Sequence, residues 1–381
     1  MSRRRRNLAL LSLAVLAGAS MTLVPARTAE YPQSPQFHDG AFHNQQVPRM
    51  PRGRESLTLW WKFLAGKRPA TRPDAPLPVE VLDAAALAGA PDNRLYRIGH
   101  SSVLVKLDGG WWLTDPVLSQ RASPLSWAGP RRFQPAAIAV DQLPPLRGVV
   151  LSHDHYDHLD KATIRALASR TELFVAPLGV GDRLLRWGVE PGKVRQLDWW
   201  DSLQVDGVHL TATPAQHFSG RGLRDRNRTL WASWAIRAPG LNLFFSGDSG
   251  YFPGFAEIGR RQGPFDLTLV ECGAYDPMWE GVHMLPEQTV QAHLDLRGRR
   301  LLPIHNGTFD LAFHDWNEPM ERVFAAARAR GVDITMPRFG QAVDALSPPP
   351  AEPWWRVPGQ EHDRRADDAL VNAPPAAGTP R

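Results

Sequence analysis

The sequence contains a single cysteine, Cys272, in 381 residues. One thiol excludes a framework of intrachain disulfides and a metal cage built from thiolates. Any metal ion must therefore be held by histidine and carboxylate side chains. No internal repeat is present, and the length suits one large domain with extensions or two average ones.

Most of the chain has no excess of positive or negative charge, although the formal net charge of the whole sequence is +5. Residues 1–28 carry five arginines and no acid, which leaves 39 of the 44 basic residues to balance 39 acidic ones. A neutral body offers no global field to a polyanion. The sequence therefore predicts no nucleic-acid partner.

Long hydrophobic runs are scarce, and the clearest one lies at the N-terminus. Arg3 to Arg6 precede an almost wholly apolar stretch from Leu8 to Val24. This pattern is typical of a signal peptide or membrane anchor, whereas a disordered basic tail would not explain the apolar run. We expect residues 1–29 to be such a leader, with the body exported or anchored outside the cytoplasm, on the periplasmic side in a bacterium.

Three further segments differ in composition. Residues 30–93 form a Pro/Arg-rich extension with an amphipathic stretch from Glu55 to Leu64, which could pack on the main domain or lie on a membrane surface. Residues 94–345 alternate short apolar runs with turns and a few helical patterns. The Pro- and Ala-rich residues 346–381 are predicted to be disordered. The main domain is thus expected to have an α/β (α+β) fold of packed sheets covered by helices.

The sharpest motif follows an apolar strand pattern at 148–152. His153, His155, Asp157 and His158 lie within six residues, ahead of a helix pattern with Asp160 as its N-cap. Crowding ionisable groups in this way is costly unless a cation neutralises them. Imidazole and carboxylate without thiolate suit Zn²⁺, with Mn²⁺ or Fe²⁺ as alternatives.

Three later apolar runs also end in a group that can bind metal. They end in His217, Asp248 and His305. With HDHYDH first, the order AQH, SGD and PIH resembles the metallo-β-lactamase fold superfamily. Stretches such as IGHSS, LTDP, GAYDP and HNGTF further resemble the subgroup of phospholipases D that hydrolyse N-acyl-phosphatidylethanolamine, and its bacterial relatives. The resemblance covers residues 94–345, and Asn306 departs from the tryptophan expected at its position.

The resemblance implies a four-layer αββα sandwich that holds two zinc ions. His153, His155 and His217 would bind the first ion, and Asp157, His158 and His305 the second. Asp248 would bridge both, so that a hydroxide between the ions could attack phosphorus or an acyl carbon.

Further residues receive supporting roles. His283 matches a position that the subgroup uses near the leaving group, so we count it with Asp157 and Asp248 as catalytic; the alternative is a residue that caps the helix from Pro286. Asp154, Asp115 and His100 are expected to hold ligands in place from behind. Two residues are candidates for substrate contact, Arg221 in the arginine-rich loop 221–228 and His314. Tryptophans that could line an acyl-chain pocket, although each alone is more often a core residue, are Trp127, Trp199, Trp200, Trp231, Trp234 and Trp279.

Three functions remain open at this stage. The leading one is a zinc-dependent phosphodiesterase of phospholipase D type, acting on a phospholipid-like substrate at a membrane. The second is a hydrolase of lactones or other esters with the same fold. The third is a metal-binding protein without turnover, against which the complete ligand set argues. The oligomeric state is not predicted.

Overall fold

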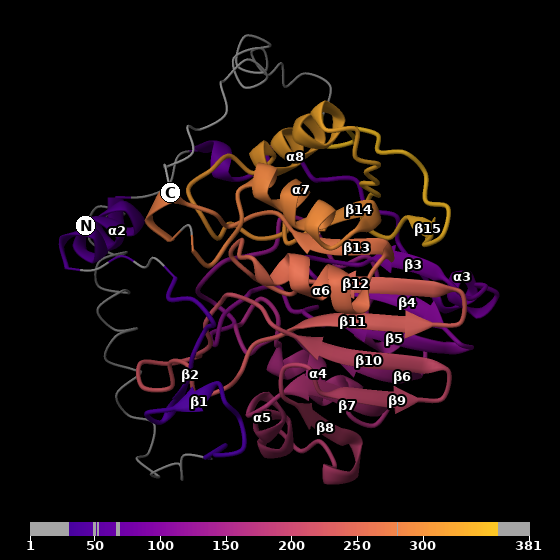
Figure 1. Ribbon diagram of the computed structural model, residues 1–381. Coiled ribbons are helices and arrows are strands. Elements are labelled where there is room, and N and C mark those ends of the chain that lie inside the picture. Colours follow the sequence, from indigo (N-terminus) through magenta and orange to yellow (C-terminus); the bar gives the residue numbers. More distant parts are fainter. Residues whose placement is uncertain (1–29, 49–50, 52, 66–68, 280, 357–381) are drawn as a thin grey trace. The chain divides into compact units, whose positions relative to one another are not determined.

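The computed structural model describes residues 30–48, 51, 53–65, 69–279 and 281–356 (Figure 1). Most of their strands form two large sheets. The first has the order β15-β3-β4-β5-β6-β7-β8, and the second has the order β14-β13-β12-β11-β10-β9. The first sheet's strands are β3 (Arg94–Arg97), β4 (Val103–Leu107), β5 (Gly110–Thr114), β6 (Leu146–Val150), β7 (Thr171–Pro177), β8 (Val194–Leu197) and β15 (Ala342–Asp344). The second sheet's strands are β9 (Ser202–Val205), β10 (Val208–Thr213), β11 (Ser233–Ala238), β12 (Leu241–Phe245), β13 (Phe265–Glu271) and β14 (Gly298–Ile304).

Alternation along the strands explains why the sheets stack face to face. Val103 and Val105 of β4 point into the cluster between the sheets, whereas Leu104 packs on the outer side. In β12, Leu243 and Phe245 face the inner cluster and Phe244 faces the outer helices. Each sheet thus has two buried faces, one towards the other sheet and one that helices must cover.

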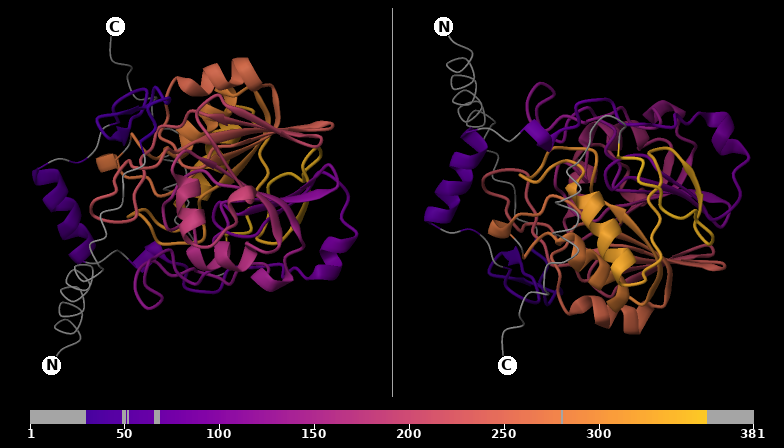
Figure 2. Two further views of the ribbon diagram at one scale, coloured as in Figure 1. Left: turned by 90° about the horizontal axis from the view of Figure 1, so that it is seen from below. Right: turned by 90° about the horizontal axis from the view of Figure 1, so that it is seen from above.

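Apart from the helix at residues 54–65, the helices lie on the two outer faces (Figure 2). The first sheet is covered by α4 (Lys161–Leu167) and α5 (Val180–Arg186), and the second by α6 (Gly254–Gln262), α7 (Pro286–Asp295) and α8 (Glu318–Ala329). The short α3 (Ala84–Ala88) also contributes Leu87 to the first outer cluster. Asp160 caps α4 as expected, since its Oδ1 accepts the Ala162 N–H at 3.1 Å. The predicted αββα arrangement is confirmed.

The extension consists of the hairpin β1 (Phe37–His38) and β2 (Ala41–Phe42), the helix α2 (Arg54–Ala65) and α3. It does not stand apart from the domain. Phe42 is buried in the cluster between the sheets, and Leu77 in the cluster under α6 to α8. The described residues from Tyr31 onward form one unit, so the boundary expected at residue 94 is not a structural one.

Two expectations concern the chain ends. Disorder from residue 346 onward is wrong for residues 346–356, because Trp355 is 1% exposed and its Nε1 donates to Glu321 Oε1 at 2.7 Å. The rest of that predicted tail, and the predicted leader at 1–29, lie outside the described residues. Within the described ranges, no helix has both the length and the apolar character needed to cross a bilayer.

Candidate metal centre

The candidate ligands gather because several strands end at the same edge of the two sheets. β5 and β6 run parallel in the first sheet, and β12, β13 and β14 run parallel in the second, so their carboxyl ends lie together. The ends of these strands, and the loops beyond them and beyond β10, supply the polar groups. In chain order they are Asp115, His153 to His158, His217, Asp248, Glu271 and His305.

Three imidazole nitrogens converge at the first candidate position. His155 Nδ1 lies 2.9 Å from His153 Nε2 and 3.2 Å from His217 Nε2. Two nitrogens bound tetrahedrally to one Zn²⁺ are about 3.3 Å apart, given Zn–N bonds of about 2.0–2.1 Å. The opposite nitrogens are anchored, His153 Nδ1 by Ser152 Oγ and His217 Nδ1 by the Val282 carbonyl, both at 2.9 Å. This anchoring leaves the converging atoms for an ion.

The second candidate position is formed by Asp157, His158 and His305. Asp157 Oδ2 lies 3.6 Å from His158 Nε2 and 3.4 Å from His305 Nε2. Both Nε2 atoms are buried and make no well-aligned hydrogen bond. Burying a polar atom without a partner is costly, and a cation between these groups would remove that cost. The donor set therefore fits a divalent metal ion.

Asp248 lies between the two positions. Its Oδ1 is 3.1 Å from His158 Nε2, and its Oδ2 is 3.0 Å from His305 Nε2 and 3.8 Å from His153 Nε2. The preceding Gly247 has φ +55°, and a Cβ there would come 2.3 Å from that of Ser152. Glycine thus permits the turn that brings a carboxylate to both positions.

The charge states in this cluster suit a cation. Burial, reinforced by neighbouring imidazoles, holds the pKa of His153 well below its usual value, so the ring keeps its lone pair. Burial opposes ionisation of Asp157 and Asp248, yet the adjacent His158 holds the pKa of both carboxyls well below the usual range. Despite burial, the same carboxylates raise the pKa of His158 well above its usual value and that of His305 to about 9, so a metal ion would displace a proton from each of these two rings when it binds.

Asp115 lies behind the cluster, as expected. Its Oδ2 accepts from His158 Nδ1 at 2.6 Å and from Ser152 Oγ at 2.5 Å, and its Oδ1 accepts the Ser152 N–H at 2.7 Å. These bonds fix the ring of His158 with Nε2 towards the centre. His100 is also buried, with Nε2 3.4 Å from Asp157 Oδ2 and its ring centroid 3.9 Å from that of His305.

Asp154 and Arg221 stabilise the loop that carries the candidate ligands His153 to His158, and neither side chain lines the large cavity. Asp154 Oδ1 accepts the Gly220 N–H at 2.8 Å, and its Oδ2 lies 2.5 Å from an amino group of Arg183. Arg221 Nη1 donates to the carbonyls of Asp154 and Leu159, both at 2.7 Å. Arg221 thus packs against the backbone of the loop after β6, which carries His153 to His158. This position gives no support to the expected substrate contact.

A cavity of about 280 Å³ opens over the metal centre. His283 and Trp279 lie in its wall together with Asp157 and Asp248. The remaining wall is mostly apolar and is contributed by Pro51, Leu59, Phe218, Val282 and Leu311. Of the tryptophans considered from the sequence, Trp279 lines this cavity, Trp199, Trp231 and Trp234 are core residues, Trp200 is partly buried, and Trp127 is exposed.

Glu271 is a functional candidate that sequence reasoning missed. It is fully buried at the end of β13, and its Oε2 accepts from His283 Nδ1 at 3.1 Å. Its Oε1 accepts the Met284 N–H at 3.0 Å. An acid at the end of an apolar run was the signal that identified Asp248, and the run LTLVEC carries it too.

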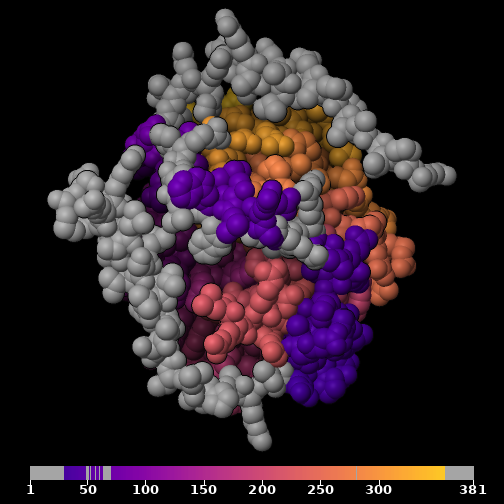
Figure 3. All heavy atoms as spheres, turned by 90° about the vertical axis from the view of Figure 1, so that its left-hand side faces the viewer, coloured from indigo at the N-terminus to yellow at the C-terminus, as the bar shows by residue number. Residues whose placement is uncertain are grey.

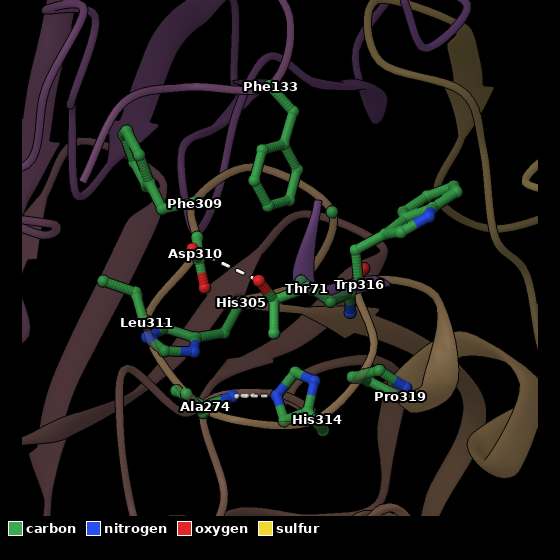
Figure 4. Close-up of a pocket in the computed structure, with 13 residues that line it drawn as sticks. Thr71, Phe133, Ala274, His305, Phe309, Asp310, Leu311, His314, Trp316 and Pro319 are labelled. Atoms are coloured by element: carbon green, nitrogen blue, oxygen red, sulfur yellow. Dashed lines mark hydrogen bonds between the residues drawn. The ribbon is translucent and has the colours of Figure 1, made fainter. Parts of the chain in front are cut away.

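His314 and Asn306 lie behind the centre, around a second and much smaller cavity (Figure 4). His314 Nε2 accepts the Ala274 N–H at 3.1 Å, so it holds the turn after β13 and is not among the residues of the large cavity. Asn306 Oδ1 accepts from Arg97 at 3.0 Å. The departure at Asn306 therefore concerns support of the His305 turn and not the wall of the large cavity.

Known proteins resemble this chain in sequence and in fold. The family model described as a beta-lactamase superfamily domain matches residues 110–306. The uncharacterized protein Rv0906 of Mycobacterium tuberculosis is 45% identical over 335 residues, which cover 85% of this chain and 88% of that protein. N-acyl-phosphatidylethanolamine-hydrolyzing phospholipase D 1 of Caenorhabditis elegans is 35% identical over 271 residues, 68% of this chain and 76% of that protein.

The fold also matches a solved structure. The isothiocyanate hydrolase from Delia radicum gut bacteria has a TM-score of 0.53 and 19% identity, and the match covers 66% of this chain and 98% of that one. At this identity the likeness concerns the fold alone. Together with the sequence matches, it shows that the chain belongs to the metallo-β-lactamase superfamily and is a metal-dependent hydrolase.

Proposed function

We propose that this protein is a dinuclear zinc-dependent phosphodiesterase of phospholipase D type that acts on a phospholipid-like substrate. The observation that carries the proposal is the apolar cavity directly over the metal-binding cluster. A hydrophobic chain fits such a wall, while the cluster at its base, when it holds divalent metal ions, would bind a phosphate. The similarity to the nematode phospholipase D supports the same substrate class.

The seven ligands would hold two Zn²⁺ ions. His153, His155 and His217 are assigned to one ion, Asp157, His158 and His305 to the other, and Asp248 to both. Bound in this way, the ions supply a water molecule of lowered pKa and electrophilic stabilisation of the phosphoryl oxygens.

His283 is assigned to the leaving group. It lies in the cavity wall, and Glu271 accepts from its Nδ1, so Nε2 is the nitrogen that can face the departing oxygen and, in the imidazolium form of the ring, donate a proton to it. Glu271 itself does not reach the substrate in this assignment. It fixes the rotamer of His283 and keeps Nδ1 as the donor to its own carboxylate.

The helix α2 is assigned to the lipid side. Leu59 of this helix lines the cavity, while Leu57 and Trp61 are 70% and 71% exposed. Figure 3 shows α2, in indigo, on the outer surface of this face. Exposed apolar side chains beside the cavity would enter the interfacial layer of a membrane, where the substrate lies. Export or anchoring by residues 1–29 would place the enzyme at such a surface.

The test compares two substrate classes on one zinc-loaded preparation. N-acyl-phosphatidylethanolamine in vesicles is assayed by mass spectrometry for phosphatidic acid, and a panel of lactones is assayed for ring opening. We expect phosphatidic acid from the wild type and none from Asp248→Asn. Turnover of lactones without any phosphodiester cleavage would replace the proposal with the ester-hydrolase alternative.

A further inference from the structure

The amide side chain of Asn44 forms hydrogen bonds with both backbone groups of His217, the carbonyl and the N–H. Its Nδ2 donates to the His217 carbonyl at 2.7 Å, and its Oδ1 accepts the His217 N–H at 3.0 Å. The same Oδ1 accepts from Trp231 Nε1 at 2.9 Å. We infer that Asn44 is a positioning residue for the metal centre, and that the segment 31–48 helps to hold the ligand His217 in place. The inference rests on the assignment of His217 as a ligand.

The orientation of the Asn44 amide follows from its partners. Its oxygen faces two N–H donors, and its nitrogen faces a carbonyl acceptor. Turning the amide by 180° would set donors against donors and an acceptor against an acceptor, so only one orientation satisfies all three bonds. The half-buried Asn44 side chain thus accepts two hydrogen bonds through Oδ1 and donates one through Nδ2.

His217 needs this support because the sheet does not reach it. β10 ends at Thr213, so the ladder between β10 and β11 stops before the ligand. The Asn44 amide takes the place of a neighbouring strand by pairing with both backbone groups. With Nδ1 donating to Val282, the backbone and one ring nitrogen of His217 are fixed, and Nε2 is left to face His155.

The extension is itself firmly held on the domain, which makes Asn44 an effective anchor. Phe42 is fully buried, with ring centroids 5.4 Å from Tyr31 and 4.9 Å from Phe37. Its backbone N–H donates to the Asn227 carbonyl at 2.8 Å, which ties the hairpin to the loop beyond His217 (Figure 1). Asn44 follows this anchor by two residues, so its position is set by core packing.

Replacing Asn44 should lower the affinity for one zinc ion more than the affinity for the other. Residues that support a ligand typically cost 10–100-fold in metal affinity when they are replaced. His217 belongs to the position shared with His153 and His155, whereas the Asp157 position has no hydrogen bond to Asn44. We therefore expect Asn44→Ala to weaken one of two zinc-binding steps by about 10–100-fold and to leave the other near its wild-type value.

The experiment titrates Zn²⁺ into the metal-free full chain against a chromophoric chelator, without substrate, so that it stands whether or not the enzyme cleaves phosphodiesters. Asn44→Asp is the isosteric test, because it keeps the acceptor for the His217 N–H but turns an oxygen towards the His217 carbonyl. It should lose at least as much affinity as Asn44→Ala. Gln45→Ala, at an exposed neighbour, is the matched control and should bind as the wild type does.

Hydrogen exchange supplies a second measurement that does not depend on metal. The amide of His217 should exchange faster in Asn44→Ala than in the wild type, with amides of β12 and β13 unchanged. Two wild-type binding steps in both Asn44 variants would overturn the inference. Equal weakening of both steps, with faster exchange throughout the sheets, would also overturn it, because Asn44 would then support the fold and not this ligand.

Discussion

His158 donates from Nδ1 to Oδ2 of Asp115 over 2.6 Å, and both side chains are fully buried. The bond joins a residue of the metal-binding loop to the end of the neighbouring strand β5. Because Nδ1 donates to Asp115, Nε2 is the nitrogen of His158 that is left for a metal ion once its proton is displaced.

Replacing Asp115 should therefore weaken metal binding without removing a ligand. We expect Asp115→Asn to lower affinity at the His158 position by about 10–100-fold, since the amide is a poorer acceptor and no longer favours one tautomer. Titration of the metal-free protein measures the effect. Asp141→Asn, at an exposed acid, serves as the control. Unchanged affinity in Asp115→Asn would remove Asp115 from the account.

Glu271→Gln tests the leaving-group role of His283. Without the carboxylate, His283 is no longer held as a donor, and general acid catalysis is worth about 10²–10⁴-fold. We expect kcat on a phosphodiester with an alkyl leaving group to fall about 100-fold, with little change in KM.

The same variant should act almost normally on a p-nitrophenyl phosphodiester, whose leaving group departs without a proton. His283→Ala should show the same selectivity, and the double variant should be little worse than either single one, since the two residues act as a unit. Equal losses on both substrates would argue against protonation of the leaving group.

Arg221→Ala distinguishes support of the loop from binding of phosphate. The guanidinium donates to two carbonyls of the metal-binding loop and stacks 3.8 Å from the ring centroid of Tyr156. Losing hydrogen bonds to a charged group should cost about 2 kcal/mol of unfolding free energy and lower metal retention. Arg224→Ala, at an exposed arginine of the same loop, should be neutral. A raised KM with unchanged stability would instead favour phosphate binding by Arg221.

The buried His293 should cause the folded protein to lose stability in mild acid. Burial lowers its pKa to about 4, and its Nδ1 is 2.7 Å from Thr268 Oγ1. Because the folded pKa lies below the unfolded value of about 6.5, protons bind the unfolded chain more readily, and stability falls as pH drops from about 6.5 to 4. The total is about 3 kcal/mol.

Urea unfolding of the metal-free protein at several pH values measures this effect. The stability difference between wild type and His293→Gln should shift by that amount across the interval, in favour of the variant at low pH. A difference that stays constant with pH would show that His293 does not titrate as described.

The candidate ligands could be selected from the sequence because each follows a buried strand, and the structure brings them together. Asp157 and Asp248 are acids in places where an unpaired charge would be costly, and their order along the chain matched a known pattern. The four layers followed from alternating strands and the helices between them. Both inferences use information that lies within a few residues of the chain.

Asp115 was expected behind the cluster, but other supporting roles could not be predicted because they depend on distant partners. Asn44 is 173 residues from His217, and an amide in a polar segment carries no sign of what it binds. Arg221 follows a ligand closely, yet packing turns it towards backbone carbonyls. Trp355, in a Pro-rich stretch that predicts disorder, is anchored by Glu321 of α8. In each case the tertiary structure decides the direction of the side chain.

The most direct test of the account is the metal content of the purified protein, measured by mass spectrometry together with phosphodiesterase activity. We expect two zinc ions per wild-type chain. In Asp248→Ala we expect loss of at least one ion and of nearly all turnover, because the carboxylate assigned to both ions is gone. An Asp248→Ala variant that keeps both ions and full activity would contradict the assigned centre.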